Sequence, residues 1–117
     1  MRHAQKNRAL SRTRSQRTAL LRGLAVSLIR DGQITTTLAK AKELQPSIER
    51  LVTHAKTDSV ASRRHVASKL GEPMDDTVKK FFTEVAPKFA ERNGGYTRIV
   101  KLGQTNGRQE AVIAFVE

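Results

Sequence analysis

The first 30 residues carry many cationic side chains that could bind phosphate groups. Eight of the 22 lysine and arginine residues lie there, and the first acidic residue is Asp31. The planar guanidinium group of arginine can donate two parallel hydrogen bonds to a phosphate and can stack on an exposed base. This segment is therefore predicted to bind a polyanion. The eight residues are Arg2, Lys6, Arg8, Arg12, Arg14, Arg17, Arg22 and Arg30.

The charge of the whole chain points to the same kind of partner. The formal net charge is +11 over 117 residues, an excess that repels itself in a compact state. A nucleic acid is the commonest anionic partner, and an anionic membrane is the alternative. However, Arg22, Gly23 and Ser27 interrupt the apolar stretch at residues 19–29, so it is neither a signal peptide nor a membrane span. We expect a cytoplasmic protein that contacts no membrane.

No combination of residues predicts catalysis. His3, His54 and His65 fall in separate predicted elements, and no acid–histidine–nucleophile order is recognisable. The chain has no cysteine, which excludes thiolate metal sites and a cysteine nucleophile. The adjacent carboxylates at residues 75–76 lie where a helix is expected to begin, and the helix dipole favours acids there. We expect no enzymatic activity, metal, cofactor or small-molecule substrate.

Two pairs of basic residues further along the chain are weaker candidates. Arg63 and Arg64 are adjacent in a predicted helix, where such a pair is usually only the solvated face. Lys40 and Lys42 lie at the start of another predicted helix, where a cation is slightly unfavourable to the helix dipole. An anion bound nearby would remove that conflict.

A glycine turn near residue 95 is a further candidate. Gly94 and Gly95 precede Tyr96 and Arg98. Glycine lets the backbone of the turn come close to a ligand, and an aromatic ring and a cation follow directly. Such a turn could contact phosphate, sugar or base. The alternative is an ordinary loop with a buried tyrosine, and the residues alone do not choose between the two.

A series of helices and short strands is expected to position these side chains. Residues 1–14 hold few apolar groups and are expected to form an extended arm that becomes ordered on a polyanion. Leucine and isoleucine recur at helical spacing after Ser15, a plausible N-cap, and stop at Asp31 and Gly32. Further helices are expected within residues 38–55, 57–70 and 75–86, and strands at 33–37, 96–102 and 110–116. Proline at position 46 predicts a kink or break in the helix at 38–55.

The strands are expected to form one small sheet. Residues 96–102 and 110–116 could form a hairpin, with 33–37 as a third strand, and both faces of 110–116 are apolar, as in a central strand. No boundary is predicted after the arm, so residues 15–117 are expected to form one domain. Its expected core includes Val60, Val66, Leu70, Phe81, Phe82, Val85 and Phe89.

Four motifs, in order along the chain, resemble those of the bacterial ribosomal protein L17 family. They are Met1–His3, the run ITTTLAKAKEL at residues 34–44, the step AKTDS at residues 55–59, and GGYTR at residues 94–98. The resemblance implies a single α+β domain of about four helices packed on a small mixed three-stranded sheet. It also implies binding to large-subunit rRNA, a place in the large ribosomal subunit near ribosomal protein L32, and no catalysis.

The resemblance further implies which residues contact rRNA. By motif match these are Arg2, His3, Lys40, Lys42, Tyr96 and Arg98, with Gly94 and Gly95 in the same turn. Charge and position alone add Lys6, Arg8, Arg12, Arg14, Arg17, Arg22, Arg63 and Arg64.

Two other functions compete with this interpretation. A nucleoid-type DNA-binding protein would use a similar basic arm, but it would need a dimer and a helix or ribbon that reaches a groove. A nuclease would need a cluster of acidic residues to hold metal ions, and the sequence offers no convincing one.

Overall fold

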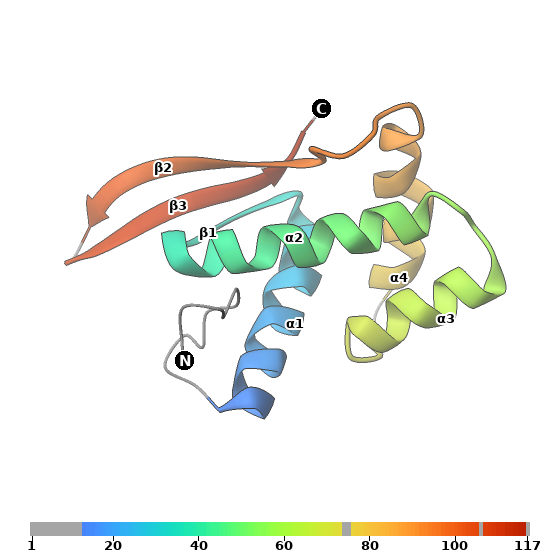
Figure 1. Ribbon diagram of the computed structural model, residues 1–117, viewed down its shortest axis with the longest axis horizontal. Helices are drawn as coiled ribbons and strands as arrows, with labels where there is room; N and C mark the ends of the chain where they lie inside the picture. The colour runs from blue at the N-terminus through green and yellow to red at the C-terminus, as the bar shows by residue number, and fades with distance from the viewer. Residues whose placement is uncertain (1–12, 74–75, 106, 117) are drawn as a thin grey trace, which may run out of the picture.

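The computed structural model describes residues 13–73, 76–105 and 107–116, and these residues form an α+β fold (Figure 1). The predicted contacts Arg2, His3, Lys6, Arg8 and Arg12 lie outside the described residues. The elements in chain order are α1 (Arg14–Asp31), β1 (Gln33–Thr37), α2 (Leu38–Ala55), α3 (Val60–Lys69), α4 (Thr77–Lys80), a π-helical segment (Phe81–Val85), a 3-10 segment (Ala86–Phe89), β2 (Thr97–Thr105) and β3 (Arg108–Phe115).

Helix α1 begins slightly earlier than the sequence predicts. Thr13 is the N-cap: its side chain accepts a hydrogen bond from the backbone of Gln16, and the Gln16 side chain accepts one from the backbone of Thr13. This reciprocal pair satisfies two backbone N–H groups at once, so it prevails over the predicted cap at Ser15. Arg14, predicted to end the arm, is therefore the first residue of α1.

Helix α2 runs through Pro46 without interruption, so of the kink or break predicted there, the break is wrong. The helix is continuous from Leu38 to Ala55, with Thr37 as its N-cap. Proline removes one backbone hydrogen bond and frees a carbonyl in the preceding turn. Pro46 is exposed, and on this side of the helix water can satisfy the freed carbonyl.

The sheet has the order β1-β3-β2, with β3 at the centre as predicted. Both strand pairs are antiparallel, which corrects the expected mixed sheet. Strands β1 and β2 point the same way, and a mixed sheet would need them to pair directly. Because β3 lies between them and runs back from the hairpin, each pair is antiparallel. Strand β2 is longer than the predicted range of 96–102, since it continues past an irregularity at Gly103 to Thr105.

The core lies where α1, α2 and the segment after α4 meet the sheet. The π-helical and 3-10 segments together bury five side chains: Phe81, Phe82, Val85, Ala86 and Phe89. Val60, by contrast, is 66% exposed at the first turn of α3, so its predicted burial is wrong. The largest fully buried side chains are Phe81, Phe89, Leu28, Ile29, Leu44, Ile48, Ile113, Val52 and Val66.

Candidate nucleic-acid interface

Several predicted cations are exposed on the described part of the chain. On α1, Arg14 and Arg22 are exposed, and Thr18 lies between them in the same shallow depression. This depression lies at the N-terminal end of α1, where the arginine-rich residues 1–12 join the helix. The other exposed predicted contacts are Lys42, Arg63, Arg64, Gly94, Gly95 and Arg98, and Lys40 is half-buried.

Arg17 differs from these residues because its charge is satisfied within the protein. Its guanidinium donates a hydrogen bond to the carboxylate of Glu43 on α2, and Glu43 is only 7% exposed. A carboxylate this deeply buried needs hydrogen-bond donors from the protein, because it has lost most of its contact with water. Arg17 therefore joins α1 to α2 through this ion pair, and its phosphate contact stays a prediction.

Arg63 also forms an ion pair, in this case on the surface of the protein. It binds Asp58, which precedes α3, through two hydrogen bonds of 2.7 and 2.9 Å, and its guanidinium lies 5.3 Å from the centre of the Phe82 ring. The hydrogen bonds from Arg63 lower the pKa of Asp58 below its usual value, and the same pair raises the pKa of Arg63. The pair supports the start of α3. Arg63 and Arg64 are both exposed, and their phosphate contacts stay predictions.

Tyr96 is buried, so the alternative of a loop with a buried tyrosine is the correct one. Its side chain is 3% exposed, and its ring packs 5.3 Å from that of Phe89. The Lys56 ammonium donates to the Tyr96 hydroxyl at 3.1 Å and to the Arg92 carbonyl at 2.6 Å. Hydrogen bonds from the Gly94 backbone and from Lys56 and Thr53 lower the pKa of Tyr96 below 10.0. The ring therefore anchors the glycine turn and is not available for stacking on a base.

Residues of α2 that the sequence analysis did not single out fix the start of β2. The Glu49 carboxylate accepts hydrogen bonds from the backbone and hydroxyl of Thr97, at 3.0 and 2.8 Å. The Gln45 side chain donates to the Thr97 carbonyl at 3.1 Å. These bonds hold Thr97 inward, so that Arg98, the next residue on the strand, is exposed. The partners are about fifty residues apart, and no local pattern indicates the pairing.

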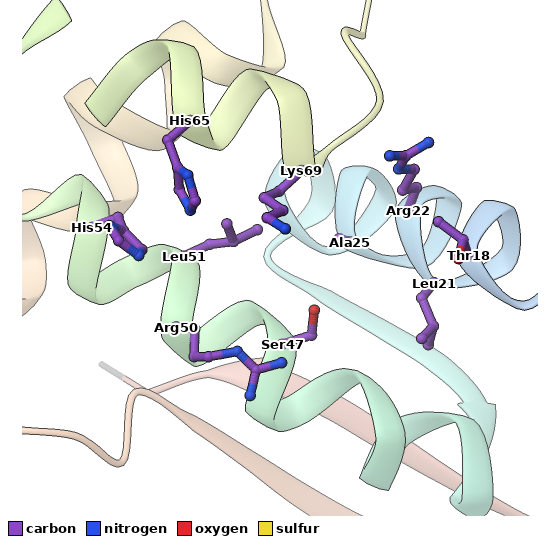
Figure 2. Close-up of a pocket in the computed structure, with 10 residues that line it drawn as sticks. All are labelled: Thr18, Leu21, Arg22, Ala25, Ser47, Arg50, Leu51, His54, His65 and Lys69. Carbon is purple, nitrogen blue, oxygen red and sulfur yellow. The ribbon is translucent and has the colours of Figure 1, made fainter. Parts of the chain in front are cut away.

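A cleft of about 450 Å³ between α1, α2 and α3 was not predicted (Figure 2). Arg22 comes from α1, Arg50 and His54 from α2, and His65 and Lys69 from α3. The two imidazole rings lie 4.2 Å apart between their centres. One sequence signal could have indicated this cleft: in both α2 and α3, a cation and a histidine are four residues apart and so share a helix face.

Two classes of site are not found in the described part of the chain. Within residues 13–73, 76–105 and 107–116, no three histidine, aspartate or glutamate side chains gather as they would to hold a metal ion. Among the helices of the same residues, none is both long enough and apolar enough to cross a membrane.

Comparison with known proteins identifies the family. A sequence model described as ribosomal protein L17 matches residues 20–117. Proteins named large ribosomal subunit protein bL17 are similar over the whole chain: one from Sulfurihydrogenibium sp. is 48% identical over 98% of its own length, and one from Hydrogenobaculum sp. is 49% identical over 100%. A third, from Akkermansia muciniphila, is 50% identical over 84% of its length. The chain belongs to the ribosomal protein L17 family.

Proposed function

We propose that this chain is a structural protein of the large ribosomal subunit, and that it binds and stabilises large-subunit rRNA in the bacterial cytoplasm. The names of its relatives and its family membership support the place in the large subunit. The observation that carries the binding role is the run of cations that begins in residues 1–12 and continues onto the exposed face of α1 at Arg14 and Arg22. The role is one of assembly and involves no catalysis.

The mode of binding follows from the charge and from the exposed side chains. Arginine and lysine side chains would neutralise rRNA phosphates and release their counterions, which makes the affinity depend strongly on salt. We assign the contacts on the described residues to Arg14, Arg22, Lys40, Lys42, Arg64, Arg98 and the backbone of Gly94 and Gly95. Arg2, His3, Lys6, Arg8 and Arg12 complete the proposed surface from the N-terminal segment.

Deletion of residues 1–12 tests the proposal. The deletion keeps Thr13, so the cap of α1 stays intact and the domain is expected to fold with unchanged circular dichroism. Incorporation into large subunits, measured by co-sedimentation, is expected to fall. Normal incorporation of the shortened chain would contradict the rRNA-binding role proposed for residues 1–12. Equal affinity for duplex DNA and for folded rRNA fragments would favour a nucleoid-type protein instead.

We also propose ribosomal protein L32 as a neighbour in the particle. The order and spacing of the family motifs support this, and the exposed side chains of Val100 and Leu102 on β2 offer an apolar strip for a protein contact. Crosslinking from position 102 in assembled subunits, followed by mass spectrometry, is expected to recover L32. Recovery of another protein alone would contradict the assignment.

A further inference from the structure

We infer that the cleft between α1, α2 and α3 is a phosphate-binding site that takes a backbone phosphodiester of the bound RNA. This inference rests on the proposed function and names a contact site that charge at the N-terminus does not predict. The fully charged side chains at the cleft are Arg22, Arg50 and Lys69, and His54 and His65 add two imidazoles. No carboxylate is found among the described residues that line it.

The cations of the cleft are not paired with acids inside the described part of the protein. None of the ion pairs formed between described residues involves Arg22, Arg50 or Lys69. This sets them apart from Arg17 and Arg63, whose carboxylate partners occupy them. Like charges that line one cleft without a counterion repel one another, and an anion bound among them attracts each of them.

The polar groups around the opening match the needs of a phosphate. Figure 2 shows the Lys69 ammonium and the Ser47 hydroxyl turned toward one another across the cleft. An imidazole has an N–H donor whether it is neutral or charged, so the pair formed by His54 and His65 can donate in either state. Phosphate oxygens accept from all of these groups, and charge-assisted hydrogen bonds are about twice as strong as neutral ones.

A tight contact places Arg22 at the edge of the cleft. A Cβ atom on Gly71 would lie 3.1 Å from Cδ of Arg22, so glycine lets the stem of this side chain lie against the end of α3. Gly71 also has a φ of 82°, a conformation that other residues rarely adopt. A larger residue at position 71 would therefore displace the Arg22 side chain at the edge of the cleft.

The cleft is continuous with the surface already assigned to RNA. Thr18 and Arg22 line both the cleft and the depression that contains Arg14 at the start of α1. One RNA strand can therefore contact the N-terminal end of α1 and then enter the cleft. A volume of about 450 Å³ lies within the range of ~300–1,000 Å³ that is typical of ligand pockets.

The test compares two variants of the full chain that each remove two positive charges. Arg50→Gln with Lys69→Gln alters the cleft, and Lys79→Gln with Lys101→Gln removes exposed cations elsewhere. Affinity for large-subunit rRNA fragments is measured over a series of salt concentrations. The slope of log affinity against log salt is negative. For the cleft variant it is expected to become shallower by about 0.7–0.9 for each phosphate that the cleft no longer neutralises. The control variant is expected to keep the wild-type slope.

Thermal unfolding of the same proteins tests whether the cleft binds free inorganic phosphate as well as the phosphodiester of RNA. In inorganic phosphate, compared with chloride at equal ionic strength, the wild type and the control are expected to gain stability that the cleft variant lacks. Equal salt slopes for the cleft and control variants would overturn the inference, even if free phosphate stabilises the wild type. If the wild-type chain bound no rRNA, the proposed function would fail first, and the cleft assignment with it.

Discussion

At the scale of single residues, the ion pair between Arg17 and Glu43 tests how the two long helices are held together. Arg17→Ala leaves the Glu43 carboxylate 7% exposed and without this donor, so we expect a loss of about 1.5–3 kcal/mol in the free energy of unfolding. Arg14→Ala, on the exposed face of the same helix, is the control and is expected to change it by less than about 0.5 kcal/mol. Urea unfolding measures both, and equal losses would contradict the pairing.

The pair formed by Asp58 and Arg63 makes a second prediction, for the pH dependence of stability. The folded pKa of Asp58 lies below 3.8, so its contribution is present above that value and is lost as pH falls through the folded pKa. The wild type is therefore expected to unfold at higher urea than Asp58→Asn at pH 7, and this difference is expected to shrink as the pH is lowered through the folded pKa. The substitution changes no atom of Arg63 or of the Phe82 ring beside it, so it probes the carboxylate. A difference that stays constant as the pH falls would show that ionisation is not its cause.

At the scale of elements, replacing Gly23 inside α1 and replacing Gly32 at its C-cap are expected to change the stability in opposite directions. Gly32 has a φ of 83° and ends the helix, so Gly32→Ala is expected to cost about 1–2 kcal/mol of unfolding free energy. Gly23 lies inside α1, and a Cβ there meets nothing within 4 Å. Gly23→Ala is therefore expected to stabilise the protein by about 0.4–1 kcal/mol. Thermal unfolding measures both, and a shift of the same sign would contradict this account of the helix end.

The same scale shows which elements the sequence predicts well. Strand β1 and helix α2 agree with the predicted ranges because their signals are local: a β-branched run at residues 33–37 and a threonine cap at Thr37. Strand β2 is longer than predicted because Gly103 indicates a loop locally, whereas pairing with β3 carries the strand past it. The π-helical turn after Lys80 also depends on packing, since it buries neighbouring phenylalanines together.

At the scale of the whole molecule, the candidate interface could be predicted only in part. The exposure of Arg14, Arg22 and Arg98 follows from charge and helix or strand periodicity. The internal roles of Arg17 and Tyr96 do not, because Glu43 and Lys56 reach them only in the folded chain, 26 and 40 residues away in sequence. The cleft was missed for the same reason, since tertiary packing alone brings the two histidines together.

The uncompensated charge also makes a prediction about the free protein as a whole. At 0.01 M salt the screening length of about 30 Å exceeds the 14.5 Å radius of gyration, so the cations of a chain with net charge +11 repel one another across the entire fold. At 0.15 M the length falls to about 8 Å, and only neighbouring cations still interact. The unfolding temperature is therefore expected to rise between these two salt concentrations. The rise should be smaller for the variant that lacks the charges of Arg50 and Lys69, because the cleft gathers like charges on three helices. A chloride titration followed by circular dichroism measures both rises, and a fall in stability with salt would show that attractive pairs dominate the free protein.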